Sequence, residues 1–197
     1  MDVEHGQGDA HDEGMTLVEL IVYAFLLIIV LGIVGTIFVN SMKTQAAVSS
    51  VTDALDNSQQ VARSVQNGIR NSTAFKLVAN GSDQLLIART LSNGAAATPA
   101  CVAWYYSATT PGSVRYTKLT SVLTAPPTAA VVATWTLLDS GVSPISGTTI
   151  FTRSSATDAA LALAFKGTAG SNRPVQISTS IVSRANGTDV SSCYTGS

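Results

Sequence analysis

The chain has 197 residues, a mass of 20.3 kDa, a charged fraction of only 12% and a mean hydropathy of +0.30. This composition excludes an intrinsically disordered chain, which needs high charge and low hydrophobicity. The net charge of −1 provides no basic field for nucleic acid. Both histidines, His5 and His11, precede the body of the protein, so His-dependent nucleophiles and His-bearing zinc sites are excluded there.

The first forty residues consist of an acidic segment followed by an apolar one. Residues 1–14 carry five acids and no Lys or Arg, and residues 20–39 carry no charge. At about 1.5 Å per residue, a helix over these twenty residues spans roughly 30 Å, the thickness of the hydrocarbon core of a bilayer. A buried core helix and a secretory signal peptide are the alternatives. The first is rarely apolar on every face, and the second needs a basic start and a cleavage site after the apolar run.

The apolar spacing then changes to that of an amphipathic helix. One stripe steps by three and four residues through Val48, Val51, Leu55, Ser58, Ala62, Val65 and Ile69. No proline occurs before Pro99, so the sequence predicts one helix over about 16–69, with a membrane-spanning part at 15–42 and an amphipathic part at 43–70.

The remainder, 71–197, predicts a β-rich domain. Runs rich in Val, Ile, Thr, Tyr and Trp between turn signals predict strands at 74–79, 84–91, 102–107, 114–120, 131–138, 148–152, 161–165 and 175–182. Residues 121–130 are expected to form a surface loop. The expected fold class is therefore α+β, with the striped half of the long helix packed on an antiparallel sheet.

The segment Gly14-Met15-Thr16-Leu17-Val18-Glu19 in front of the apolar run resembles the N-terminus of type IV pilins and pseudopilins. The resemblance implies that a prepilin peptidase removes residues 1–14, cutting between Gly14 and Met15, and that Met15 becomes N-methylated. Glu19 is the fifth residue from Met15, where the family has a glutamate. The leaders of the family are normally basic and many major pilins have a proline in the membrane helix, and this chain departs from both patterns.

The resemblance also assigns an assembly role to the start of the helix, at Thr16, Leu17 and Glu19. A carboxylate within hydrocarbon is unfavourable, and the amine released by cleavage on a neighbouring subunit would offset that penalty. A carboxylate that simply snorkels to the membrane edge is the alternative. The implied partners are other pilin or pseudopilin subunits, the prepilin peptidase, the inner-membrane assembly platform and, before assembly, membrane lipid. The implied location is the cytoplasmic membrane, then a surface pilus or periplasmic pseudopilus.

Two further features are expected to support the exported domain. Cys101 and Cys193 are the only cysteines, and an even number in an exported chain predicts one disulfide, as pilins have, with two buried free thiols as the alternative. Trp104, Tyr105 and Tyr106 form a run that belongs to the core or provides a weak binding surface for DNA or glycan.

Two functional classes remain open at this point. The first is a polymerising structural subunit, and the length and helix-end sequence favour a minor pilin or pseudopilin. The second is a single-pass membrane protein that displays its β domain for adhesion or sensing without polymerising. No enzymatic site, catalytic residue, cofactor or metal is expected, because two thiols without a histidine do not make a metal site.

Overall fold

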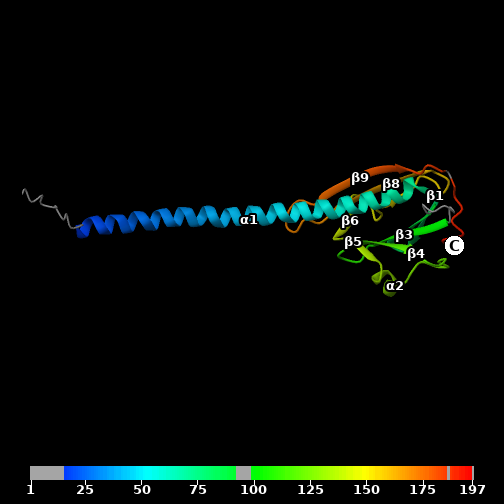
Figure 1. Cartoon of the computed structure of the whole chain (residues 1–197), viewed down its shortest axis with the longest axis horizontal. Helices are drawn as coiled ribbons and strands as arrows, with labels where there is room; N and C mark the ends of the chain where they lie inside the picture. The colour runs from blue at the N-terminus through cyan, green and yellow to red at the C-terminus, as the bar shows by residue number, and fades with distance from the viewer. Residues whose placement is uncertain (1–15, 92–98, 186, 197) are drawn as a thin grey trace, which may run out of the picture. The chain divides into compact units, whose positions relative to one another are not determined.

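The computed structural model describes residues 16–91, 99–185 and 187–196. The chain divides into two compact units, Met1–Ala46 and Ala47–Ser197. Figure 1 shows the order of the elements, which begins with the long helix α1 (Leu17–Arg70) and continues with strands and one short helix. The α+β class expected from the sequence is confirmed.

Helix α1 agrees with its predicted limits to within one residue at each end. Thr16 provides the N-terminal cap, because its Oγ1 accepts a hydrogen bond from the main-chain N–H of Glu19 at 3.3 Å. At the other end, Arg70 places a positive charge in the last turn, where the helix dipole favours a cation. Ser72, just after the helix, donates from its hydroxyl to the carbonyl of Ile69 at 2.7 Å. That bond satisfies one of the carbonyls that a helix end leaves open.

The first sheet has five antiparallel strands in the order β1-β2-β3-β4-β5. Their bounds are Ser72–Asn80 (β1), Asp83–Leu91 (β2), Pro99–Ser107 (β3), Ser113–Leu119 (β4) and Thr136–Ser140 (β5). The turn predicted between the first two strands is present, and Gly81 adopts a positive φ of 64° there.

The second sheet is also antiparallel and has β8 at its centre. Its bounds are Val142–Pro144 (β6), Phe151–Thr152 (β7), Ala160–Gly167 (β8) and Val175–Val182 (β9). Strands β6 and β7 pair with β8 on one side, and β9 pairs with it along its whole length. Strand β9 has the limits predicted from the sequence.

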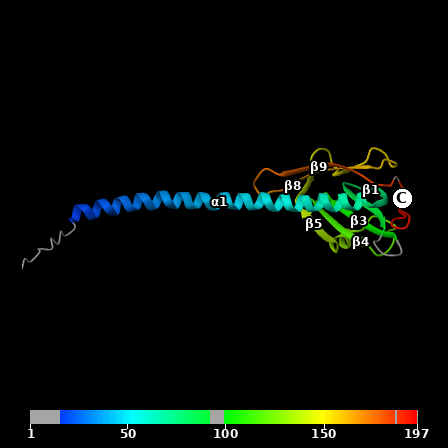
Figure 2. The same ribbon diagram turned by 45° about the horizontal axis from the view of Figure 1, so that its top comes forward.

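Within the second unit, the part of α1 from Ala47 onward lies between the two sheets (Figures 1 and 2). Its buried residues are Ala54, Ser58, Val61, Ala62, Val65 and Ile69. Four of these, Val61, Ala62, Val65 and Ile69, share one core with both sheets. This core includes Phe75, Leu86 and Trp104 of the first sheet and Leu163 and Phe165 of the second. The helix approaches closely at Gly68, where an added Cβ would lie 2.0 Å from Cη2 of Trp104. Any larger residue at this position would have to displace the Trp104 ring, so glycine is favoured.

The predicted buried stripe of the helix is wrong in its first three positions. Val48, Val51 and Leu55 are 60%, 37% and 37% exposed. The face that contacts the domain there contains smaller side chains, since Ser50 Oγ accepts a 2.8 Å hydrogen bond from the Asn172 amide and Ala54 is buried. In this part of α1, the face that contains Ser50 and Ala54 therefore packs against the domain, in place of the predicted face with Val48, Val51 and Leu55.

A second apolar core covers the other face of the five-stranded sheet. It combines Leu85, Ile87 and Tyr105 of the sheet with Trp135, Val190 and Tyr194 of the segments that pack on it. Helix α2 (Ala129–Ala133) belongs to this layer, with Val132 buried. The predictions of a strand at 131–138 and a loop throughout 121–130 are therefore wrong in part. Strand β7 is also shorter than the predicted 148–152, and β6 was not predicted.

One buried amide joins the two sheets. The side-chain N–H of Gln84 in β2 donates to the carbonyl of Phe151 at 2.8 Å. Its carbonyl accepts from the main-chain N–H groups of Ile150 and Phe151 at 2.8 and 3.0 Å. Three hydrogen bonds made by one buried side chain fix β7 against the first sheet.

Candidate assembly site

The start of α1 brings together the residues to which the sequence assigned an assembly role. Thr16 caps the helix and Glu19 lies in its first turn. Leu17 is 75% exposed, so it is open to another chain or to lipid. Negative charge near a helix N-terminus is favourable, and this local effect also gives Glu19 a role independent of any partner.

The side chain of Glu19 has one intramolecular partner in the described part of the chain. The hydroxyl of Tyr23, one turn further along α1, donates to Oε1 of Glu19 at 3.0 Å. A carboxylate accepts at two oxygens, so Oε2 remains available to a second donor. Sequence reasoning missed Tyr23, although its i+4 spacing from Glu19 is the signal that would have found it.

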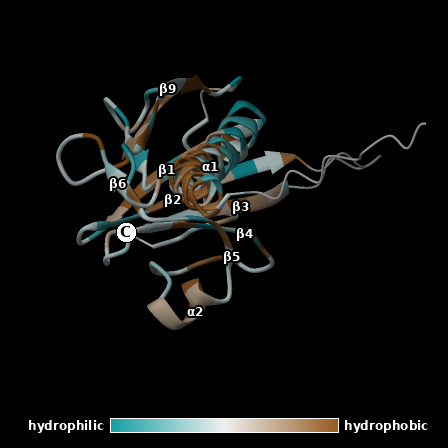
Figure 3. Ribbon diagram, turned by 90° about the vertical axis from the view of Figure 1, so that its left-hand side faces the viewer, coloured by the Kyte–Doolittle hydropathy of each residue, from teal (hydrophilic) through white to brown (hydrophobic). Residues whose placement is uncertain are grey.

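The helix that follows is apolar on all sides. Every residue from Thr16 to Val39 is exposed, and most of these side chains are large and apolar. Figure 3 shows the nearest turns of α1 in the colour of hydrophobic residues. This helix is long and apolar enough to cross a membrane as a single-pass anchor. Gly32 and Gly35 lie within it, and nothing lies within 4 Å of a Cβ added at either.

Two residues of the predicted site, Gly14 and Met15, lie outside the described residues. Cleavage between them and N-methylation of Met15 stay predictions, as does the role of the cleaved amine. The structure therefore describes the acceptor, Glu19, but not the amine of Met15 that is predicted to be its donor.

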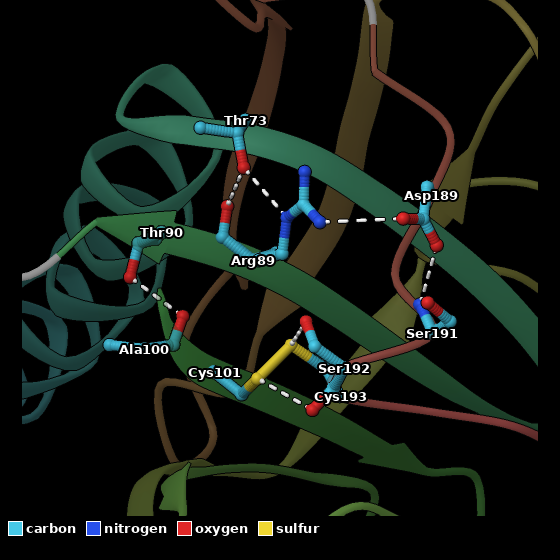
Figure 4. The surroundings of a disulfide bond; sticks show 9 residues. All are labelled: Thr73, Arg89, Thr90, Ala100, Cys101, Asp189, Ser191, Ser192 and Cys193. Atoms are coloured by element: carbon cyan, nitrogen blue, oxygen red, sulfur yellow. Dashed lines mark hydrogen bonds and ion pairs between the residues drawn. A yellow bond between two sulfur atoms is a disulfide. The ribbon is translucent and has the colours of Figure 1, made fainter. Parts of the chain in front are cut away.

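The disulfide expected between Cys101 and Cys193 is confirmed. Their Cα atoms lie 5.5 Å apart, and the bond joins β3 to the C-terminal segment (Figure 4). It closes a loop with a sequence separation of 92, for which the loop-entropy model gives about 4–5 kcal/mol of stabilisation. The alternative of two free thiols is thereby removed.

The aromatic run in β3 belongs to the interior. Trp104, Tyr105 and Tyr106 are 1%, 5% and 2% exposed, so they offer no face on which a base or sugar could stack. Alternation sends Trp104 and Tyr106 into one core and Tyr105 into the other. Burial, reinforced by the hydrogen bond from its hydroxyl to the Asp83 carboxylate at 2.7 Å, raises the pKa of Tyr105 to about 12. A binding role for these three rings is therefore corrected to a structural one.

A buried carboxylate that no sequence motif indicated also contacts the helix. Oδ2 of Asp139 in β5 accepts a hydrogen bond from Ser58 of α1 at 3.2 Å. Burial raises the pKa of Asp139, while the hydrogen bonds from Ser58 and from the main chain of Ser140 act in the opposite direction. The Asp139–Ser58 contact fixes one turn of α1 to the first sheet.

Among residues 16–91, 99–185 and 187–196, no group of three or more His, Cys, Asp or Glu side chains is arranged to hold a metal ion. Comparison of the chain with protein-family models, with curated proteins and with solved structures gives no match.

Proposed function

We propose that this chain is a prepilin-like structural subunit, a minor pilin or pseudopilin. It is cleaved after Gly14 and polymerises through the N-terminal part of α1 into a type IV pilus or pseudopilus. Such a fibre would serve DNA uptake, adhesion, motility or secretion.

One observation carries the proposal. The N-terminal half of α1 exposes large apolar side chains on every face, and a single carboxylate, Glu19, lies at its beginning. An all-round apolar helix is stable only in lipid or among other apolar helices. The sequence Gly14-Met15-Thr16-Leu17-Val18-Glu19, at the start of this helix, supports an environment of other apolar helices after an initial stay in lipid.

The chemistry of Glu19 supports an assembly step that needs a second subunit. In the proposal, the amine of a cleaved Met15 donates to Oε2 of Glu19 on a neighbour while Tyr23 retains Oε1. A charged donor and a charged acceptor that pair in a low-dielectric environment each relieve the desolvation penalty of the other. Neither penalty would be offset by lipid, so the pair favours the polymer over the dispersed subunit.

The proposal implies a sequence of locations and partners. The unprocessed chain would lie in the cytoplasmic membrane, where a prepilin peptidase removes the leader. An inner-membrane assembly platform would then transfer the subunit into the fibre. In the fibre, other pilin or pseudopilin subunits replace lipid around α1.

A second function is favoured by one specific observation. Residues 1–14 contain five acids and no Lys or Arg, whereas the leaders of the pilin family are basic. This composition would suit a single-pass anchor that keeps its first residues and displays the β domain for adhesion or sensing. The two functions differ in the N-terminus of the exported protein.

Intact-mass and N-terminal peptide mass spectrometry of the membrane-embedded and exported protein tests the proposal. We expect the exported chain to begin at Met15 and to carry one methyl group on its amine. A Gly14→Val variant should keep its leader and remain in the membrane, while Gly8→Val, within the same leader, should be processed normally. An exported wild-type chain that still contains residues 1–14 would overturn the proposal and favour the anchored protein.

A further inference from the structure

A cavity of about 710 Å³ opens on the second unit, far along the chain from the assembly site. Its wall combines strand β1, the segment after β7 and the C-terminal segment, and two cations, Lys76 and Arg153, line it. The volume falls within the range of small-molecule sites. The functional proposal above uses none of these residues.

The guanidinium of Arg153 is held in place by three contacts. It lies over the ring of Phe75 with 4.0 Å between Cζ and the ring centroid. Nη1 donates to the carbonyl of Phe75 at 3.1 Å, and Nε donates to the carbonyl of Asp158. Burial lowers the pKa of Arg153, while the charge of the nearby Asp158 acts in the opposite direction. An anion at Nη2 would compensate this loss of solvation.

Lys76 presents the second cation on the same cavity. Its Nζ lies 5.0 Å from the ring centroid of Tyr194 and donates to the carbonyl of Gly196 at 3.0 Å. An ammonium group has three N–H donors, so this bond leaves two for a ligand. Both contacts orient the side chain and reduce the entropy that a ligand would otherwise have to offset.

The one carboxylate among the lining residues is directed toward a different cation. Asp189 pairs with Arg89 at 3.5 Å and accepts from the main-chain N–H of Ser191 at 2.9 Å (Figure 4). Arg89 does not line the cavity. Asp189 thus has its cationic partner outside the cavity, and the two cations Lys76 and Arg153 outnumber this one carboxylate on the wall, which favours an anion.

The rest of the lining distinguishes between kinds of anion. Five residues of the wall carry a hydroxyl group, the phenol Tyr194 and the aliphatic Ser155, Thr188, Ser191 and Thr195. Hydroxyl donors and acceptors beside two cations match a ligand that carries several hydroxyls and one carboxylate. An extended acidic peptide fits less well, because the edge of β1 is already occupied. Arg153 binds the carbonyl of Phe75, and Ala74 forms a bridge with Gly187.

From this arrangement we infer that the cavity binds an acidic saccharide, with the carboxylate of a hexuronate unit between Arg153 and Lys76 and its hydroxyls on the Ser and Thr side chains. The second unit thereby acquires a recognition function separate from polymerisation. This inference does not depend on whether the chain polymerises.

The test uses the full chain in detergent micelles and two probes that differ at one carbon. D-glucuronate carries a carboxylate where D-glucose carries a hydroxymethyl group, so their comparison isolates the charge. Binding is followed by isothermal titration calorimetry and by ligand-observed NMR at low salt. Lys76→Gln and Arg153→Gln remove the two cations, and Arg173→Gln removes an exposed cation that does not line the cavity. Thermal unfolding of each variant checks that the second unit remains folded.

We expect glucuronate to bind with a dissociation constant of millimolar order and glucose not to bind measurably. Each cavity variant should weaken glucuronate binding by about tenfold, because one charge-assisted hydrogen bond is lost, and Arg173→Gln should bind as the wild type does. Equal binding of glucose and glucuronate would overturn the inference. So would acetate binding as tightly as glucuronate, since the hydroxyls would then contribute nothing. Folded Lys76→Gln that binds like the wild type would also overturn it.

Discussion

Replacement of Glu19 by alanine tests the assembly site directly. The variant keeps the bond from the main-chain N–H of residue 19 to Oγ1 of Thr16, so the start of α1 should be unchanged. It removes the only carboxylate in the first turn. We therefore expect cleavage and methylation to continue while incorporation into the fibre falls.

The size of the effect follows from the hydrogen bond that is lost. Tyr23 occupies Oε1 at 3.0 Å, so in the proposed assembly step the amine of a neighbouring subunit would gain one charge-assisted bond at Oε2. Such a bond contributes about 1.5–3 kcal/mol. This range corresponds to a change of roughly 10- to 150-fold in the equilibrium between dispersed and polymerised subunits.

Co-expression of wild-type and variant chains in one cell provides the assay. Quantitative mass spectrometry gives the ratio of the two chains in purified fibres and in the membrane. A fibre-to-membrane ratio at least tenfold lower for Glu19→Ala is expected. The double variant Glu19→Ala/Tyr23→Phe is the matched control, because it also removes the hydroxyl that loses its acceptor. Equal incorporation of Glu19→Ala and the wild type would refute the ion-pair argument.

Three further predictions concern the second unit and are measured by denaturation of the full chain in detergent, with tryptophan fluorescence. Gln84→Leu leaves two main-chain N–H groups and one carbonyl without partners in the core, and should lower the free energy of unfolding by roughly 3–6 kcal/mol. The exposed Gln176→Leu should have little effect. Gly68→Ala places a Cβ against Trp104. This variant should lower the free energy of unfolding by about 1–3 kcal/mol despite the better helix propensity of alanine. An unchanged unfolding midpoint would contradict this contact. Burial raises the pKa of Asp139 in the folded state, so its contribution to stability is lost as pH rises from the ordinary aspartate pKa through the folded one. Asp139→Asn should flatten this part of the pH profile and be more stable than the wild type at neutral pH; an unchanged profile would contradict that reasoning.

The parts of the fold that were predictable are those dictated by local pattern. The apolar run and its change to a helical stripe define α1, and the alternation and flanking turns define β9. Residues 131–138 misled the prediction because Val131 and Val132 have strand propensity, yet α2 forms there as Val132 and Trp135 pack into the second core. Propensity is a weak prior when tertiary packing opposes it.

One feature of the sequence indicated the second core, although the prediction from alternating apolar residues did not use it. In β2, the residues Gln84, Leu85, Leu86, Ile87 and Ala88 are buried consecutively. Such a continuous run is typical of a strand covered on both faces, whereas alternation would indicate one solvent face. The covering segments, around Trp135 and Tyr194, are distant in sequence, so their position depends on the chain path.

The candidate site was predictable as a set of residues but not as a geometry. Spacing from Met15 identified Glu19, while its bond to Tyr23 depends on side-chain rotamers that no motif specifies. The cavity around Arg153 was not predictable at all. It forms where β1, the segment after β7 and the C-terminal segment meet. These three segments are distant in sequence and come together only in the folded protein.

Val48, Val51 and Leu55 form a second exposed apolar stripe on α1, separated from the apolar run by residues 40–45, which include Asn40 and Lys43. Val48, Val51 and Leu55 recur at spacings of three and four residues, on a helix whose neighbouring face is fixed to the domain through Ser58 and Ala54. A partner helix that covered this stripe would gain roughly 1–2 kcal/mol per side chain. Under the proposed function that partner is a neighbouring subunit, and the gain would add to that of the Glu19 pair.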